Sequence, residues 1–401
     1  MRSWLSIIGM GEDGLDGLPA ASRAALEAAD IVFGGPRHLR LAGVGVRGQP
    51  WPVPFSVAPV LAARGRKVVV LASGDPFWFG AGGTLAAHLK PEEWRAFPVP
   101  STFSLMAARL GWRLEDTLCL GLHATSFDRL APHLAAGARV FCLVRDGAAV
   151  PALGAWLDAR GYGESLVHVF EAVGGLREHY AQGLAHVLDA LPVPSPDEGG
   201  VPVAVALEVR GGPGRIRASG LPDDAFQHDG QITKRPVRAL TLCALAPRWG
   251  ESLWDIGAGS GSICVEWLLA TGPAGRVCAI EPRADRVATV RANAAAFGVA
   301  GQLTLIAGRA PDALEGLPAP HAVFIGGGAS AALLAAIWAR VPPGTRIVAN
   351  GVTLETQALL TAWSARHGGT LLRIDLAQAE PLGGMRGWVP ARPIVQWSVE
   401  R

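Results

Sequence analysis

The sequence predicts an α/β protein made of two domains. Short strand-like runs alternate with Ala- and Leu-rich helical stretches, which is typical of parallel sheets with crossover helices. The chain has 401 residues, which is long for one domain, and half of them are apolar. Gly and Pro number 51 and 30, but they stand at the ends of apolar runs, which favours short turns over disorder.

The first half contains five clear strand patterns with helix patterns between them. The strands are expected at 4–9, 31–34, 67–72, 140–144 and 203–209, and helices, for example, at 18–29 and 103–110. Turn-forming residues at 210–214 and 219–224 then interrupt the pattern and predict a linker.

A new series of strands and helices begins after the linker. Strands are expected at 252–257, 276–281, 302–307, 321–326 and 345–350, and helices at 234–246, 261–270, 283–297 and 330–340. We therefore expect one domain at residues 1–212 and another at 220–401.

Charge and cysteine content exclude several classes of function. The net charge is only +2, so nothing indicates a nucleic-acid interface. The five cysteines form no C-x-x-C pair, and we expect a reduced, cytoplasmic protein without disulfides or a metal site. We also expect no secretory signal and no membrane segment, because no apolar run approaches the roughly 18 residues that a span requires.

A glycine loop in the second half indicates a cofactor site. The strand expected at 252–257 leads into Asp255-Ile256-Gly257-Ala258-Gly259-Ser260-Gly261. Glycines let a ligand approach the turning backbone, and the following helix presents its N-terminal amides. Asp255 would attract a cationic sulfonium and repel a pyrophosphate, and Glu281 ends the next strand, where it could accept ribose hydroxyls. The loop therefore favours S-adenosylmethionine over a dinucleotide, and a dehydrogenase is the least favoured class.

Two further sets of turns follow predicted strands. In the first half these are Gly9-Met10-Gly11, Ser73-Gly74-Asp75-Pro76 and Pro100-Ser101-Thr102, which we expect to converge on one cleft. Ser101 or Thr102 is the expected cap of the helix that follows. In the second half, Gly326-Gly327-Gly328 lies where open α/β sheets bind ligands and suggests close approach of substrate.

The turns of the first half resemble the tetrapyrrole methylase family over roughly residues 1–210. One departure is Glu12-Asp13-Gly14, where many members have Pro-Gly-Asp-Pro, and another is Val173-Gly174, where Leu-Gly is common. Residues 220–401 resemble the decarboxylating precorrin methyltransferases. The stretches that carry this second resemblance include 221–226, Ile232-Thr233-Lys234, the loop at 255–261 and 310–314.

The two resemblances imply a tetrapyrrole-methylase fold of two α/β subdomains followed by a Rossmann-like class I methyltransferase domain. They imply methylation of precorrin-6B (6Y) at C5 by the first domain and at C15 by the second. Loss of carbon dioxide from the ring C acetate would accompany the second methylation and give precorrin-8X in cobalamin biosynthesis. Two S-adenosylmethionine sites and a homo-oligomer are also implied.

Motif position also assigns candidate site residues. The cofactor contacts would be Gly9, Ser73, Asp75, Ser101 and Thr102 in the first domain, and Thr233, Asp255, Gly257, Gly259, Gly261, Glu281 and Ala310 in the second. Asn350, Glu355 and Lys234 are the catalytic candidates on the substrate side, although Asn350 could stand in a plain turn and Lys234 could be a solvated helix-start residue. His38 and His123 are candidate proton carriers, with a purely structural role as the alternative.

Three alternative functions remain open on the sequence alone. A cobalt-precorrin methyltransferase of the oxygen-independent route would carry the same motifs. An RNA methyltransferase could share the first domain's fold, but the near-neutral charge speaks against it. A nucleotide-binding regulatory protein with a degenerate first site would account for Glu12-Asp13-Gly14.

Overall fold

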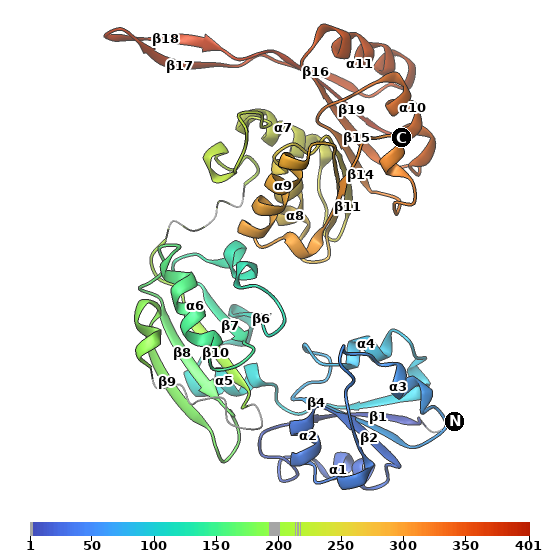
Figure 1. Cartoon of the computed structure of the whole chain (residues 1–401), viewed down its shortest axis with the longest axis vertical. Helices are drawn as coiled ribbons and strands as arrows, with labels where there is room; N and C mark the ends of the chain where they lie inside the picture. The colour runs from blue at the N-terminus through green and yellow to red at the C-terminus, as the bar shows by residue number, and fades with distance from the viewer. Residues whose placement is uncertain (1–2, 192–200, 213, 215, 217) are drawn as a thin grey trace. The chain divides into compact units, whose positions relative to one another are not determined.

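The computed structural model describes residues 3–191, 201–212, 214, 216 and 218–401. These residues belong to two units, one formed by Met1–Phe127 and His133–Gly214 and the other by Asp128–Pro132 and Arg215–Arg401 (Figure 1). Residues 213, 215 and 217 of the expected linker lie outside the described residues. Each unit is described by itself below.

The first sheet of the first unit is parallel throughout, in the order β3-β2-β4-β1-β5. Its central strands β1 (Leu5–Met10) and β4 (Val68–Ser73) are almost entirely buried, as expected for strands covered on both faces. The other strands and the helices that connect them are β2 (Ile31–Gly34), β3 (Gly48–Pro50), β5 (Trp94–Phe97), α1 (Ala20–Glu27), α2 (Pro36–Leu41), α3 (Ala58–Ala62) and α4 (Gly82–Ala86).

The second sheet of this unit is mixed, in the order β6-β7-β10-β8-β9. Only β6 and β7 run parallel, so the expectation of parallel sheets throughout is wrong here. Strands β8 (Leu166–Glu171) and β9 (His179–Leu184) are joined by residues 172–178, too few for the crossover that a parallel pair needs. The remaining elements are α5 (Thr102–Leu110), β6 (Leu118–Gly121), β7 (Arg139–Leu143), α6 (Ala149–Asp158) and β10 (Val203–Glu208). Two α/β subdomains are thus confirmed.

The second unit has a seven-stranded sheet in the order β13-β12-β11-β14-β15-β19-β16. The five strands from β13 to β15 are parallel, and β19 runs antiparallel to both of its neighbours. This arrangement confirms the expected Rossmann-like domain. Its strands are β11 (Ser252–Ile256), β12 (Arg276–Glu281), β13 (Leu303–Ala307), β14 (Ala322–Ile325), β15 (Arg346–Gly351), β16 (Thr370–Ile374) and β19 (Ile394–Glu400). Its helices are α7 (Arg235–Leu245), α8 (Ser262–Thr271), α9 (Ala284–Ala296), α10 (Ala331–Arg340) and α11 (Leu354–His367).

A β-hairpin projects from the second unit beyond β16 (Figure 1). It consists of β17 (Ala377–Leu382) and β18 (Met385–Pro390), which pair only with each other. Its apolar side chains face solvent: Leu382, Met385 and Trp388 are 70%, 78% and 76% exposed. The hairpin therefore buries little of its own apolar surface within the chain.

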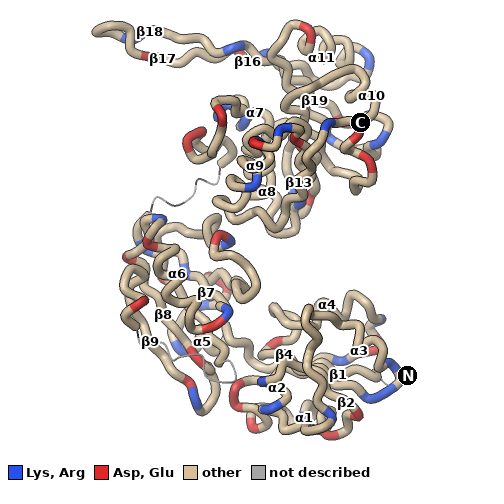
Figure 2. Tube along the Cα trace, viewed as in Figure 1, with Lys and Arg blue, Asp and Glu red and all other residues tan. Residues whose placement is uncertain are grey.

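Basic and acidic residues are interspersed along the chain trace in both units (Figure 2). All five cysteines are free thiols. Among the described residues, no helix has the length and apolar character needed to cross a membrane.

Candidate active sites

Three turns of the first unit meet at one point. A Cβ atom on Gly9 would lie 1.7 Å from the carbonyl oxygen of Gly74, and one on Gly74 would lie 2.6 Å from the Cα atom of Ser101. The backbones of these turns therefore touch directly, and glycine is required at position 9 for close approach. The convergence expected from the sequence is confirmed.

A pocket of about 590 Å³ opens beside these turns, lined by residues of both subdomains. Ser73, Ser101 and Thr102 line it, as expected of cofactor contacts. Gly9 packs against the Gly74 carbonyl, and the Asp75 carboxylate accepts the backbone N–H of Phe77 at 2.8 Å and closes a turn. Both residues were expected to contact cofactor, but neither is among the residues that line this pocket.

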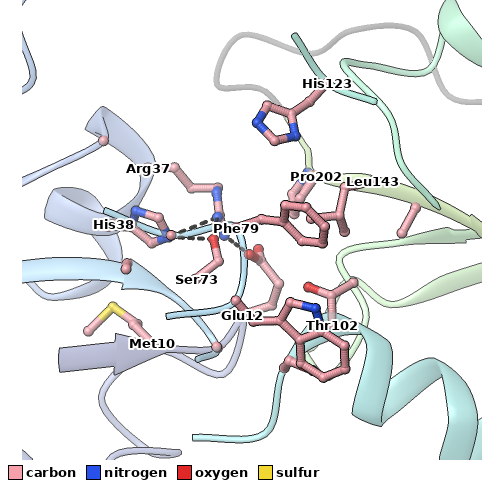
Figure 3. A pocket seen from close by; sticks show the side chains of 18 of the residues that line it. Met10, Glu12, Arg37, His38, Ser73, Phe79, Thr102, His123, Leu143 and Pro202 are labelled. Atoms are coloured by element: carbon pink, nitrogen blue, oxygen red, sulfur yellow. Dashed lines mark hydrogen bonds and ion pairs between the residues drawn. The ribbon is translucent and has the colours of Figure 1, made fainter. Parts of the chain in front are cut away.

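A chain of polar side chains crosses one wall of this pocket (Figure 3). Arg37 forms an ion pair with Glu12 and donates to the Ser73 hydroxyl at 3.1 Å. The same guanidinium lies 3.0 Å from Nε2 of His38, and the Ser73 hydroxyl lies 3.0 Å from that nitrogen. A guanidinium can only donate, so Nε2 of His38 accepts and the ring is neutral.

The electrostatics of the pocket agree with a neutral His38. Burial, followed by the positive charge of Arg37, lowers the pKa of His38 to about 3. Burial also lowers the pKa of Arg37 to about 10, with Arg40 and Arg177 contributing by repulsion. A neutral His38 that accepts from Arg37 favours the structural role over that of a proton carrier. His123 lines the pocket from the other subdomain (Figure 3).

Aromatic side chains supply much of the remaining wall. Trp51, Phe55, Trp78, Phe79 and Phe103 all line the pocket. Phe79 has φ +57°, a left-handed conformation that costs a non-glycine residue about 1 kcal/mol and is concentrated at functional sites. Flat apolar walls next to a partly buried arginine suit a planar ring system that carries carboxylates.

The sequence missed Glu12 and Arg37 as site residues. Glu12 was noted only as a departure from the family pattern, and Arg37 lies in Gly34-Gly35-Pro36-Arg37-His38. Glu12 stands where many family members have proline, and this difference could have indicated the site. A partly buried carboxylate needs a positively charged or hydrogen-bonding partner, which here is Arg37.

The glycine loop of the second unit turns through three left-handed residues. Gly257, Gly259 and Gly261 have φ +73°, +62° and +74°, and α8 begins directly after them. A Cβ atom on Gly257 would also lie 3.1 Å from the backbone N and O atoms of Gly327. The glycine triplet expected to approach substrate therefore packs, at Gly327, against the backbone of this loop.

Glu281 braces the glycine loop from the end of β12. Its buried carboxylate accepts the backbone N–H of Gly259 at 2.9 Å and that of Arg283 at 3.0 Å. Each carboxylate oxygen keeps a further lone pair, so acceptance of ribose hydroxyls is compatible with this geometry.

Asp255 lies inside the core and is 1% exposed. The Cys264 thiol donates to its Oδ2 at 2.8 Å, whereas its Oδ1 is buried with no hydrogen-bond partner among the described residues. Burial raises the pKa of Asp255 to about 7, although the Cys264 hydrogen bond opposes the shift. A buried oxygen without a partner destabilises the unliganded domain and would be satisfied by a cationic ligand.

The other candidates of the second unit occupy different environments. The Thr233 carbonyl accepts from Arg238, and Ala310 is partly exposed after β13. The Asn350 side-chain amide donates to the Thr241 hydroxyl at 3.0 Å, and its oxygen accepts from the Gln396 amide at 3.0 Å.

Lys234 and Glu355 are both exposed at helix starts. Lys234 stands before α7. Glu355 lies in the first turn of α11, where a backbone hydrogen bond and then Thr353 lower its pKa. These two catalytic candidates lie on the surface, whereas Asn350 belongs to an internal network.

Each half of the chain matches a family model of known methyltransferases. Residues 5–188 match the family model of tetrapyrrole (corrin/porphyrin) methylases, and residues 224–401 match that of the precorrin methyltransferase domain. Together with the two folds and the two glycine-bordered sites, these matches define a two-domain methyltransferase.

Individual relatives extend this result to the whole chain. A precorrin-6Y C(5,15)-methyltransferase (decarboxylating) from Sinorhizobium sp is 47% identical over 98% of this chain and 96% of its own length. This chain therefore belongs to the family of precorrin-6Y C(5,15)-methyltransferases (decarboxylating), which are S-adenosylmethionine-dependent enzymes.

Two further relatives each match less than half of this chain. A probable cobalt-precorrin-6B C(15)-methyltransferase (decarboxylating) from Saccharolobus solfataricus is 39% identical over 42% of this chain and 85% of its own length. A crystal structure of the C-terminal domain of a precorrin-6Y C5,15-methyltransferase from Rhodobacter capsulatus is 59% identical, covers 47% of this chain and 100% of that chain, and has a TM-score of 0.45.

Proposed function

We propose that this chain methylates precorrin-6B (6Y) at C5 and C15 and removes the carboxyl group of the ring C acetate, giving precorrin-8X. The proposal rests on the similarity to the precorrin-6Y C(5,15)-methyltransferase (decarboxylating) from Sinorhizobium sp, which aligns with this chain over 96% of its own length. Neither half is missing, so one chain holds the parts needed for both methylations.

We assign C5 methylation to residues 1–212, and C15 methylation with decarboxylation to residues 220–401. A relative named for the C15 reaction alone covers 42% of this chain, and residues 224–401 match the precorrin methyltransferase domain, which supports this division. The two sites are built differently, one on converging turns and the other on a single glycine loop. We therefore expect two molecules of S-adenosylmethionine per chain.

The residues of each site fit this chemistry. S-adenosylmethionine, when bound, supplies a methyl group on a cationic sulfur. In the first unit, Arg37 would orient a substrate carboxylate and the aromatic wall would exclude water. In the second unit, Glu281 would hold the ribose and Asp255 would face a cationic ligand. The reduced macrocycle supplies the electron-rich carbon and the electron sink for decarboxylation, so the protein mainly positions its substrates.

Mass spectrometry of the precorrin product tests the proposal. The full chain should add two methyl groups and release one carbon dioxide. A Gly259→Arg chain, whose second site is blocked, should add one methyl group and retain the carboxyl group. Decarboxylation by the Gly259→Arg chain would contradict the assignment of that reaction to residues 220–401.

A cobalt-loaded substrate is the second candidate, because a relative that covers 42% of this chain is named for cobalt-precorrin-6B. Comparing turnover of metal-free and cobalt-loaded precorrin by the full chain distinguishes the two. Preference for the metal-free ring supports the leading proposal, and preference for the cobalt form replaces it.

We further propose that the chain forms a homo-oligomer through the β17–β18 hairpin. This hairpin exposes Leu382, Met385 and Trp388, the kind of apolar surface that marks a protein interface. Light scattering should give a mass that is a multiple of the chain mass, and this mass should fall when Trp388 is replaced by Lys.

The free thiols are compatible with residence in a reducing cytoplasm.

A further inference from the structure

Residues 220–233, here called the strap, pack onto the second unit just before α7. Leu221 and Phe226 are buried in its core, and Ile232 packs against the same cluster of side chains. Phe226 also stacks on Phe297 with a ring separation of 4.9 Å. The strap is therefore an integral part of this unit.

Buried charged groups hold both ends of the strap. Glu266 accepts the backbone N–H groups of Gly220 and Leu221 at 2.6 and 3.0 Å. It also accepts from Arg238 at 2.6 Å, and Arg238 in turn donates to the carbonyl of Thr233. The two ends of the strap are thus tied to one ion pair.

Asn293 joins the middle of the strap to the glycine loop. This α9 side chain is 2% exposed and makes two hydrogen bonds with the backbone of Gln227, accepting its N–H and donating to its carbonyl, both at 2.9 Å. The same amide donates to the carbonyl of Ser260 at 2.8 Å. Because Ser260 lies between Gly259 and Gly261, one buried side chain bridges the strap and the glycine loop.

A second connection runs through the start of α9. Asp229 of the strap pairs with Arg286 at 2.8 Å and with Arg283 at 3.6 Å. The backbone N–H of Arg283 is held by Glu281, whose carboxylate also holds Gly259. The strap and the glycine loop therefore depend on the same short stretch of chain.

We propose that Asn293 is a positioning residue of the second cofactor site and couples docking of the strap to the shape of the glycine loop. The inference rests on the proposed function, because it takes the loop as a cofactor site. Coupling is reciprocal: a ligand that stabilises the loop in this shape also stabilises the docked strap, and a displaced strap weakens ligand binding.

Hydrogen exchange of the full-length chain with and without S-adenosylhomocysteine tests the coupling. The ligand should slow amide exchange in peptides covering 255–262 and also in peptides covering 221–233. In Asn293→Ala the strap should lose this protection. Affinity at this site should fall about tenfold, because the carbonyls of Gln227 and Ser260 lose a buried donor.

Gln302→Ala is the matched control. The Gln302 amide also donates to two backbone carbonyls, those of Gly272 and Gly275, but these precede β12 at the opposite end from the glycine loop. Both variants should lower the unfolding temperature, whereas only Asn293→Ala should raise the KM for S-adenosylmethionine in C15 methylation with kcat nearly unchanged. An equal KM effect in both variants would overturn the positioning role.

Hydrogen exchange of the unsubstituted chain tests the coupling even if a variant fails to fold. If the ligand protects 255–262 but leaves 221–233 unchanged, the coupling is absent and the inference fails alone. If the ligand leaves 255–262 unprotected, the proposed second cofactor site fails instead.

Discussion

The two units use glycine at their candidate sites for different physical reasons. In the first unit, a Cβ atom on Gly9 would lie 1.7 Å from the Gly74 carbonyl oxygen, so close approach excludes any side chain. In the second unit, a Cβ atom on Gly259 would lie at an ordinary 3.9 Å from the Gly257 carbonyl oxygen, but Gly259 has a φ of +62°. One position is limited by volume and the other by backbone conformation. A glycine motif alone therefore does not reveal what a substitution would cost.

The largest effect is expected for Gly9→Ala. The new methyl group would overlap the Gly74 carbonyl, so the turns after β1 and β4 would have to separate at a cost of more than about 3 kcal/mol. The expected product carries the C15 methyl group and has lost carbon dioxide, but lacks the C5 methyl group. Mass spectrometry and thermal unfolding measure both effects. A Gly9→Ala chain that still adds two methyl groups would refute the volume argument.

The second prediction is an opposite pH dependence of the two units. The folded pKa of His38, about 3, is below its ordinary 6.5, so the first unit loses stability as pH falls from 6.5 towards 3. The folded pKa of Asp255, about 7, is above its ordinary 3.8, so the second unit loses stability as pH rises from 3.8 towards 7. Between pH 4 and pH 8 each effect is on the order of 3 to 4 kcal/mol.

Hydrogen exchange of core peptides from each unit, measured from pH 4 to pH 8, would separate these dependences after correction for intrinsic exchange rates. His38→Gln should flatten the first dependence and Asp255→Asn the second. Parallel behaviour of the two units across this range would show that other groups dominate.

The third prediction compares two glycines within one loop. Gly257→Ala combines a left-handed conformation with a Cβ atom 3.1 Å from Gly327, whereas Gly259→Ala is strained only in its backbone. We expect losses of about 2 and about 1 kcal/mol in the free energy of unfolding. Denaturant titration measures both, and equal losses would mean that the Gly326–Gly328 turn yields at no cost.

Sequence pattern predicted most of the local structure but not the pairing. The strands that carry the glycine turns were found within one or two residues, because buried runs and glycines are local signals. The antiparallel β10 and the position of β19 between β15 and β16 depend on contacts far apart in the chain. No element was predicted beyond residue 350, although Gly383-Gly384 between two strand-like runs is a recognisable hairpin signal.

The candidate sites show the same division. The glycine loop and Glu281 could be read from the sequence because each follows a strand directly. The pairing of Glu12 with Arg37, and the bridge that Asn293 forms to Ser260, join residues that no spacing rule connects. The environment of Asp255 was also beyond reach, because burial beside Cys264 is a property of the packed core.

The smallest predicted effect compares the helix caps of the two units. Ser101 caps α5 by accepting the N–H of Ser104 at 3.1 Å, and Thr353 caps α11 by accepting that of Thr356 at 3.2 Å. Replacing either by Ala should cost about 1 kcal/mol in the free energy of unfolding. Only Ser101 lines the pocket, so only Ser101→Ala should also slow C5 methylation. Steady-state kinetics of both variants test this, and slowing by Thr353→Ala would contradict it.

The place of β19 in its sheet has a consequence for synthesis of the chain. Because β19 lies between β15 and β16, neither of those strands has its full set of backbone partners until residues 394–400 have left the ribosome. The first unit contains no residue of this region, so it can fold while translation continues. Until then, the open edge of β15 is exposed to any strand nearby, and a chaperone that covers it would protect the nascent enzyme from aggregation.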